Sequence, residues 1–448
     1  MTQQFLKPLA LAAAVALALT ACGKSEQAAT PAPAKPATAA SAAAPASAAT
    51  TAAAAAPKSV FDVSELGPSS EACTDFNSFV NAKWVAANPI PSDYPMWGSF
   101  VQLYAKSLDD QHQLVEAAAK NADTAKAGSV EQKIGWLYKS GMDDAAIEKA
   151  GFDPIKPKLA AIDGLKNTAD IVKYLDQTAA EGDGQVFGFG SGADFKDATN
   201  QIGYAVQGGL GLPTKDYYFK PQYKDLRAAY LAYIAKTLEL TGVSEADAKK
   251  QADQVMKFET ALAGASLAPT EMRNLDNQYH FVSVKDADKV TPHFSWEQFF
   301  KTQGVTIDKG FSLSQPKFFA EFDKLLTTAP ASEWQAYLRF HTIDDASNAL
   351  SKAFRDNRFA FYGKTLTGTP EQKARWKQVL AGVNSAMGMG LGELYVAKYF
   401  SPQAKQRAEQ LVTNVRDALK NRIEHLTWMS DATKAKAIDK WNKFLPKI

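Results

Sequence analysis

The chain has 448 residues, with 46% apolar and 22% charged side chains. This composition is ordinary for globular proteins, and the length allows roughly three domains at about 150 residues each, which excludes a small disulfide-stapled scaffold. The formal net charge of +2 comes from residues 1–57, so the remaining chain carries equal numbers of basic and acidic side chains. Because such a body has no overall field to attract phosphates, we expect no nucleic-acid partner.

Residues 1–21 have the pattern of a bacterial export signal. Lys7 precedes an apolar run over residues 9–19, which is too short for a membrane span and is followed by Leu-Thr-Ala-Cys at 19–22. Small residues before a cysteine resemble a lipoprotein processing site, which predicts lipidation of Cys22. Gly23, where an aspartate would signal retention, favours an outer-membrane lipoprotein that faces the periplasm and is held by acyl chains. The alternative is an ordinary export signal with an incidental cysteine.

Residues 22–59 are predicted to form a disordered tether. Residues 28–57 contain 18 alanines and five prolines but no large apolar side chain. Such a segment cannot bury enough surface to offset its ordering entropy, and its prolines interrupt helix formation. If Cys22 is acylated, Cys73 has no partner for an internal disulfide, and we expect it to be a free, half-buried thiol.

Residues 60–448 are predicted to form one mainly helical domain. After an N-cap at Ser401, apolar residues recur at helical spacing and indicate a surface helix packed on a core. That stripe consists of Ala408, Leu411, Val412, Val415, Leu419 and Ile423. Further helical patterns cover 106–122, 129–141, 168–181, 222–241, 245–264, 316–327, 331–364, 370–398 and 431–444. Residues 185–192 and 201–207 favour a β-hairpin, so the fold class is mainly α with a small sheet.

No catalytic or metal-binding residue is assigned from these patterns. The five histidines are His112, His280, His293, His341 and His425, and no two of them are four residues apart. The chain therefore has no HExxH zinc motif. Ser191 lies between two glycines but lacks the G-x-S-x-G spacing of a nucleophile elbow.

A group of glycines and a group of acidic residues could each be taken for a functional site, but the sequence does not favour either interpretation. Gly388, Gly390 and Gly392 deviate from the G-x-G-x-x-G nucleotide motif and are better explained by close helix packing. Glu259, Glu271 and Asp276 are acidic residues in one neighbourhood of the sequence. We expect them to be helix caps or solvated side chains, because sequence alone cannot make them a catalytic pair.

Three stretches have residue compositions that a generic helix or strand pattern does not explain. Residues 207–218 combine three glycines, a proline and two tyrosines, which predicts a tight turn covered by aromatic rings. Residues 73–84 follow the pattern Cys-x-Asp-Phe-x-x-Phe-x-Asn-x-x-Trp and are followed by Ile90-Pro91. The third stretch runs from Phe361 to Met429 and is rich in aromatic residues.

In this order and at these distances, the stretches resemble the N-terminal region of the neprilysin-like zinc metallopeptidases, peptidase family M13. Lys133-Ile134, Ser140 to Asp143, Glu271-Met-Arg273 and Tyr362-Gly-Lys364 fit further blocks of the family, so the resemblance covers residues 61–448. It marks a set of structural motif residues: Trp84, Gly208, Gly209, Gly211, Pro213, Asp216, Tyr217 and Tyr218. Asn81 stands where extracellular animal members have a cysteine, so their local disulfide is not expected.

The resemblance implies a lobe that caps the active site of an enzyme for small peptides. In the complete family enzyme, zinc polarises the scissile carbonyl and a glutamate activates water. The zinc motif lies C-terminal to the region matched here, so no catalytic or metal residue is transferred to this chain and no bound zinc is expected. We therefore expect the N-terminal part of a membrane-anchored endopeptidase that is inactive alone, with a catalytic half that is missing or separately encoded. The alternative is a non-enzymatic periplasmic lipoprotein that binds peptides or a partner.

Overall fold

The computed structural model describes residues 63–68 and 71–448, so the predicted signal, Cys22 and the whole of the predicted tether lie outside the described residues. The chain divides into two compact units between Pro89 and Ile90. In the first, the short 3-10 helix η1 (Val63–Glu65) precedes helix α1 (Phe76–Ala87). Asp75 caps α1 by accepting a hydrogen bond from the backbone N–H of Ser78 at 2.9 Å.

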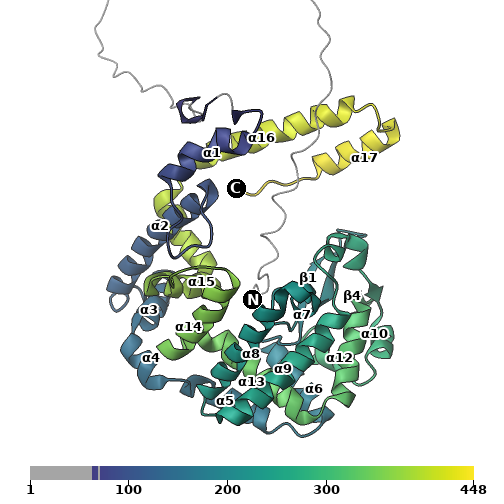
Figure 1. The fold of residues 1–448 in the computed structure, drawn as a ribbon. Coiled ribbons are helices and arrows are strands. Elements are labelled where there is room, and N and C mark those ends of the chain that lie inside the picture. The colour runs from purple at the N-terminus through teal and green to yellow at the C-terminus, as the bar shows by residue number, and fades with distance from the viewer. Residues whose placement is uncertain (1–62, 69–70) are drawn as a thin grey trace, which may run out of the picture. The chain divides into compact units, whose positions relative to one another are not determined.

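The second unit, residues 90–448, contains the remaining elements (Figure 1). The helices of its first half are α2 (Ser99–Asn121), α3 (Val130–Met142), α4 (Asp144–Ala150), η3 (Asp153–Ile155), α5 (Lys156–Asp163), α6 (Thr168–Ala180), α7 (Lys215–Phe219), η4 (Pro221–Tyr223), α8 (Lys224–Glu239) and α9 (Glu245–Ala265). Those that follow are η5 (Glu271–Arg273), η6 (Leu275–Asn277), α10 (Val284–Val290), α11 (Trp296–Thr302), α12 (Pro316–Thr328), α13 (Ala331–Ala346), η7 (Ser347–Ala349), α14 (Lys352–Arg358), the π-helical η8 (Phe359–Leu366), α15 (Arg375–Tyr399), α16 (Pro402–His425) and α17 (Asp431–Asn442). The strands are β1 (Phe187–Ala193), β2 (Gln201–Gln207), β3 (Phe281–Val282) and β4 (Phe311–Leu313).

A large aromatic core organises the region from α5 to η8. Its largest fully buried side chains include Trp296, Trp334, Tyr230 and Tyr337. The ring of Phe187 on β1 lies 5.5–5.7 Å from the rings of five aromatic neighbours on α11, α12 and the preceding loop. Edge-to-face arrangements at such distances add specific geometry to the burial of apolar area. Residues of α9 and α13 contribute to this core, so these two helices lie at the centre of the region.

A smaller core joins α2, α3 and α15. Its buried side chains include Leu108, Ile134, Leu380 and Val383. A Cβ added at Gly135 of α3 would lie 2.2 Å from the carbonyl oxygen of Ala118, so glycine is required where α3 approaches the backbone of α2.

The sheet is mixed and has the strand order β1-β2-β4-β3. The hairpin β1–β2 is antiparallel, with Phe187 opposite Gln207, whereas β2 and β4 run parallel with Tyr204 opposite Ser312. The predicted fold class, mainly α with a small sheet around this hairpin, is confirmed. The two short strands β3 and β4 were not expected, because segments of two or three residues show no alternating pattern.

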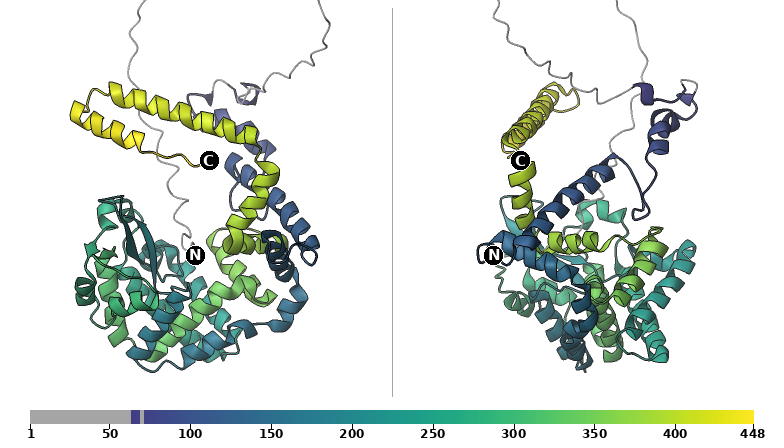
Figure 2. Two further views of the ribbon diagram at one scale, coloured as in Figure 1. Left: turned by 180° about the vertical axis from the view of Figure 1, so that it is seen from behind. Right: turned by 90° about the vertical axis from the view of Figure 1, so that its left-hand side faces the viewer.

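Three expectations were wrong. The pattern over 331–364 is not one helix but the succession α13, η7, α14 and η8. Cys73 is a free thiol as expected, but it is exposed and not half-buried. The apolar stripe of α16 does not pack on a core: no residue of this helix is buried, and Leu411, Val415 and Leu419 are 64%, 60% and 51% exposed. In Figure 2, α16 runs beside α17, and the Arg416 guanidinium of α16 lies over the Trp441 ring of α17.

Among the described residues, no helix combines the length and apolarity that a membrane crossing requires.

Candidate functional site

The glycine-rich turn at Gln207–Tyr218 is tied to the end of α9. The Gln207 side chain exchanges two hydrogen bonds with the backbone of Leu267, of 3.1 and 2.7 Å. Lys215 Nζ donates to the carbonyl oxygens of Gly264 and Ser266 at 3.1 and 2.9 Å. These contacts hold the turn, which joins β2 to α7, against the end of α9. Helix α7 in turn packs on α8 and α9 (Figure 1).

Two glycines of the turn have no room for a side chain. Gly209 has a φ of 71°, and an added Cβ would lie 2.4 Å from the Tyr337 hydroxyl. At Gly211, an added Cβ would lie 1.7 Å from the hydroxyl of Tyr230. Gly208 is less constrained, with Phe187 Cα at 3.2 Å from the position of a Cβ. Aromatic hydroxyls therefore occupy the space that side chains at these positions would need.

The remaining motif residues have different roles. Pro213 is exposed, and Asp216 pairs with Lys220 one turn later at 2.7 Å. The Tyr217 ring stacks on Tyr223 with 4.1 Å between centroids. The hydroxyl of Tyr218 is buried, accepts a hydrogen bond from the backbone N–H of Leu212 at 3.1 Å and donates to Glu259 Oε2 at 2.6 Å. Tyr218 thus connects the turn to the core.

Glu259 is the centre of a buried polar network. Its side chain is fully buried on α9 and accepts hydrogen bonds from Tyr218 at 2.6 Å and Tyr230 at 3.0 Å. His341 Nε2 on α13 lies 2.8 Å from Glu259 Oε1. Burial and the Glu259 carboxylate hold the pKa of Tyr218 and Tyr230 well above the usual value, so both phenols remain protonated donors.

His341 supplies the counter-charge of Glu259. Burial disfavours the charged imidazole, but the hydrogen bond to Glu259 and its Coulomb attraction outweigh this effect and raise the pKa of His341 above its ordinary value. A buried carboxylate requires such partners, because an unpaired charge in the interior is strongly destabilising. The pair joins α9 to α13.

A second buried carboxylate, Asp344, lies one turn further along α13. Tyr233 and Arg358 both donate to its Oδ1, and the Tyr362 hydroxyl lies 3.4 Å from its Oδ2. Burial disfavours the charge on Arg358, yet the attraction of Asp344 prevails and raises its pKa. The Tyr362 hydroxyl also lies 3.2 Å from the carbonyl oxygen of Gly211, so this cluster reaches the same turn.

The network positions the turn and does not present reactive groups to solvent. Glu259 is 0% exposed and His341 is 8% exposed, so neither can reach a substrate. The expectation that Glu259 is a cap or solvated side chain was therefore wrong, whereas Glu271 is exposed, and its Oε2 accepts a hydrogen bond from the Ala268 N–H at 2.6 Å. Sequence reasoning also missed His341 as a partner. The usable signal was the spacing of Val255, Glu259 and Leu262, which places a carboxylate within an apolar helical stripe.

The other residues singled out from the sequence are dispersed. Trp84 belongs to the first unit and contributes its carbonyl to Asn88 Nδ2 at 2.7 Å. Of Gly388, Gly390 and Gly392 on α15, Gly390 allows close packing, since an added Cβ would lie 2.9 Å from Val130 Cγ1. Gly388 and Gly392 have no neighbour within 4 Å of that position, so packing does not explain them.

A family comparison identifies the chain. The family model for the N-terminal domain of peptidase family M13 matches residues 72–448, so the chain belongs to this family and the expected resemblance is confirmed. Neprilysin-3 of Drosophila melanogaster is 28% identical over 400 residues, which cover 83% of this chain and 50% of the fly protein. An endothelin-converting enzyme homolog of Locusta migratoria is 29% identical, covering 84% and 54%. The chain spans about half the length of these curated relatives.

Solved structures show the same fold. The zinc metalloprotease Zmp1 of Mycobacterium tuberculosis, solved with an inhibitor, superposes with a TM-score of 0.79 at 30% identity, covering 86% of this chain and 58% of that one. PepO of Lactobacillus rhamnosis gives a TM-score of 0.74 at 22% identity, over 82% and 58%, which supports the fold alone. Members of the family are zinc metalloproteases, but no three His, Cys, Asp or Glu side chains group as metal ligands within residues 63–68 and 71–448. The described residues thus offer no ligand set that fits zinc.

Proposed function

We propose that this chain supplies the N-terminal, non-catalytic part of a zinc endopeptidase that cleaves small peptides. The observation that carries the proposal is the match of residues 72–448 to the N-terminal domain of a family whose curated relatives are about twice as long as the matched region. In this proposal the lobe limits access to the active site, and zinc and the catalytic glutamate are supplied by another polypeptide segment. The buried network around Glu259 keeps the lobe rigid.

The surface of α15, α16 and the C-terminal residues supports a partner of this kind. Apolar side chains remain solvent-exposed there, among them Met389 at 86%, Leu411 at 64% and Trp428 at 75%. Clusters of exposed apolar side chains are typical of surfaces that are covered in the functional state. The alternative, a non-enzymatic lipoprotein that uses the lobe by itself, requires this surface to be polar. The exposed stripe of α16 therefore favours the two-part peptidase.

The proposed location rests on the sequence of the N-terminal segment. Cys22 would carry the acyl chains, and residues 22–59 would give the lobe reach from the outer membrane into the periplasm. The partners in this proposal are the lipid bilayer, small peptides in the assembled enzyme, and a catalytic half that is missing from this sequence or separately encoded. Metabolic labelling with a palmitate analogue tests the anchor, because Cys22→Ala should abolish incorporation and Cys73→Ala should not.

A peptidase assay tests the catalytic part of the proposal. We expect the purified chain to leave small fluorogenic peptides intact with or without added zinc, because its sequence contains no HExxH motif. A peptidase of the same family with both halves serves as the positive control. Turnover by the chain that a chelator abolishes and zinc restores would overturn the proposal.

A further inference from the structure

Strand β1 forms one edge of the sheet, because the strand order places only β2 beside it. Figure 1 shows the β1–β2 hairpin projecting from the helices around it. Within β1, Ser191 and Ala193 are exposed, Phe187 is buried, and the residues between are half-buried. Strand β1 therefore has a free edge that solvent reaches along its second half.

The register shows which backbone groups of β1 lie at this free edge. Just beyond the strands, the Asp194 N–H donates to the Asn200 carbonyl oxygen at 3.0 Å. Bonded pairs alternate along an antiparallel ladder, so the even-numbered residues of β1 face β2 and the odd-numbered ones face away. On the other side of β2, the Ala205 carbonyl oxygen accepts from the Ser314 N–H at 2.9 Å, as this alternation requires. The half-buried or exposed residues of β1 whose backbone groups face outward are Phe189, Ser191 and Ala193.

These outward-facing groups are unpaired in the part of the chain that the structure describes. The N–H and carbonyl groups of Phe189 and Ser191 make no hydrogen bond there, and neither does the N–H of Ala193. The Ala193 carbonyl oxygen accepts one bond, from the Tyr204 hydroxyl at 2.8 Å. An extended segment laid along β1 would thus meet a row of free backbone donors and acceptors.

Strand β1 lacks the features that normally protect an edge strand from pairing. Charged side chains, prolines and β-bulges are the usual protection. The segment Phe187–Ala193 has the sequence FGFGSGA, without charge or proline, and it pairs with β2 in unbroken register. The edge is therefore able to accept a further strand.

One face of β1 leaves room for the side chains of an added strand. A Cβ at Gly190 would meet nothing within 4 Å. Tyr204 of β2 is opposite Gly190, so its ring is on this face, 5.3 Å from the ring of Phe195, which is 52% exposed. Directly opposite residues of neighbouring strands point to the same face, so side chains opposite Gly190 and Gly192 would lie beside these rings. Aromatic side chains there would bury apolar ring surface.

We propose that the edge of β1 binds an extended peptide as an additional antiparallel strand. Backbone hydrogen bonds to Phe189, Ser191 and Ala193 hold the peptide, and alternate side chains of aromatic character lie over the glycines. A second copy of this strand fits less well, because glycine would face glycine across the new pair and little apolar area would be buried. The proposal goes beyond the proposed function, since binding at this edge requires neither zinc nor a catalytic half.

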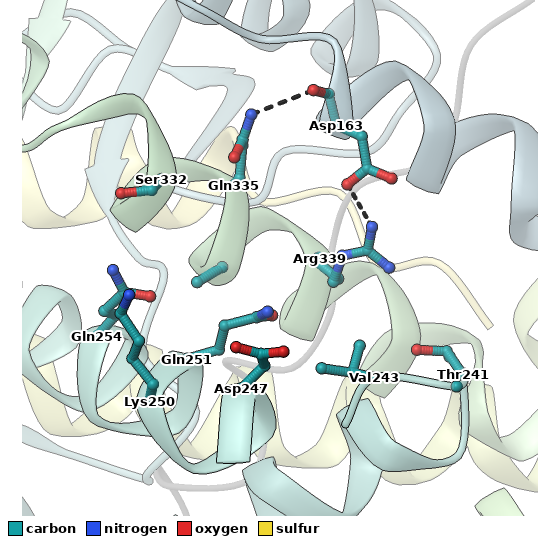
Figure 3. A pocket seen from close by; sticks show the side chains of 12 residues that line it. Asp163, Thr241, Val243, Asp247, Lys250, Gln251, Gln254, Ser332, Gln335 and Arg339 are labelled. Atoms are coloured by element: carbon teal, nitrogen blue, oxygen red, sulfur yellow. Dashed lines mark hydrogen bonds and ion pairs between the residues drawn. The ribbon is translucent and has the colours of Figure 1, made fainter. Parts of the chain in front are cut away.

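A polar cleft between α9 and α13 is a second place where part of a peptide could bind. Its volume is about 300 Å³, and its lining includes no residue of β1. Figure 3 shows the Arg339 side chain directed to Asp163, with Lys250 on the far side of the cleft. One carboxylate could not contact both cations, so this cleft provides a control site for the binding experiment.

Calorimetric titration of the full chain tests the proposal with the peptide acetyl-Lys-Thr-Tyr-Thr-Tyr-Thr-Lys-amide. Its blocked ends carry no terminal charge, and its tyrosines fall opposite Gly190 and Gly192 when its threonines pair with the outward-facing residues. We expect saturable binding with a Kd below about 1 mM.

Two methylated forms of this peptide test the hydrogen bonds directly. N-methylation of the second and third threonines removes two donors to the edge and should weaken binding at least about tenfold. N-methylation of both tyrosines, whose N–H groups face away from β1, should change the Kd by less than about threefold. Absence of saturable binding up to about 1 mM, or any other order of the two methylated peptides, would overturn the proposal.

Ser191→Pro provides the variant test. Proline removes the outward-facing N–H, and an edge strand tolerates proline at such a position, so the fold should be retained. Peptide binding should weaken at least about tenfold. Ser191→Ala, which keeps the N–H, and Lys250→Gln, which changes the polar cleft, are the matched controls and should bind as the original chain does.

Three results with these variants would overturn the assignment. Equal affinity of Ser191→Pro and the original chain would show that the peptide binds elsewhere, and weaker binding by Lys250→Gln would place it in the polar cleft. Self-association that Ser191→Pro abolishes in the absence of peptide would show that a second copy of the chain occupies the edge. The methylated peptides test the edge without any variant.

Discussion

Gly211 is the residue at which the turn depends most directly on the absence of a side chain. We predict that Gly211→Ala destabilises the chain by about 2–3 kcal/mol, because the added Cβ would lie 1.7 Å from the buried Tyr230 hydroxyl and would displace a donor of Glu259. Chemical denaturation measures this change as a lower midpoint. Gly190→Ala on β1, where a Cβ meets nothing within 4 Å, is the control and should not destabilise. Equal midpoints for the two variants would show that the turn accommodates the added Cβ without loss of stability.

Tyr218 and Tyr217 are adjacent tyrosines with different partners. Tyr218→Phe removes a donor from the fully buried Glu259 carboxylate, and we predict a loss of about 1.5–3 kcal/mol in the free energy of unfolding. Tyr217→Phe keeps the ring that stacks on Tyr223 and should cost less than about 0.5 kcal/mol. The same denaturation measurement compares them. If the two variants lose equal stability, the hydrogen bond to Glu259 does not anchor the turn.

The raised pKa of His341 makes part of the stability depend on pH. In the folded protein the pKa of His341 lies above the ordinary value of 6.5, so the folded state holds the imidazole proton more tightly than the unfolded state does. The contribution of protonated His341 to the free energy of unfolding is therefore fully present below about pH 6.5 and is lost as the pH rises through the raised pKa. We predict that the stability difference between the original chain and His341→Gln shrinks from pH 6 towards pH 9. A difference that is constant or grows over this range would contradict an ion pair with Glu259.

At the scale of elements, α16 is only partly covered by α17. Trp441 of α17 lies against Arg416, with its Nε1 donating to the Arg416 carbonyl at 2.8 Å, while Leu411, Val415 and Leu419 remain exposed. We predict that the chain self-associates through this stripe. Replacing all three residues by glutamine should reduce association in sedimentation velocity while changing stability by less than about 0.5 kcal/mol per site, since none is buried.

Two outcomes would decide against this account of α16. A sharp monomer for the original chain at high concentration would show that the stripe does not drive association. A large loss of stability in the triple variant would show that the stripe is covered within the chain. Lys405→Gln together with Glu409→Gln, two exposed changes on the same helix, controls for altered surface polarity.

The sequence predicts the helices and the hairpin better than their packing. Periodicity located α6 and α9 to within a residue or two, because their apolar stripes face a core. The same kind of periodicity gave a wrong prediction for α16, because an apolar pattern shows which face of a helix is apolar but not which residues cover that face. Gly208 to Tyr218 could be singled out by composition. Glu259 and His341 could not be paired, because 82 residues separate them and only the packing of α9 against α13 brings them together.

For the whole molecule, membership of peptidase family M13 and the mainly helical lobe agree with each other. The chain carries the buried network around Glu259, and it spans about half the length of its curated relatives.

The mass of the native polypeptide in the bacterial membrane fraction tests the central claim most directly. An antibody raised against residues 90–448 would detect it, and peptide mapping would follow its C-terminal region. We predict a species much larger than the 48.4 kDa of this chain, with an HExxH motif beyond residue 448. A native species that matches this chain without its signal segment, and that purifies without a catalytic partner, would contradict the account.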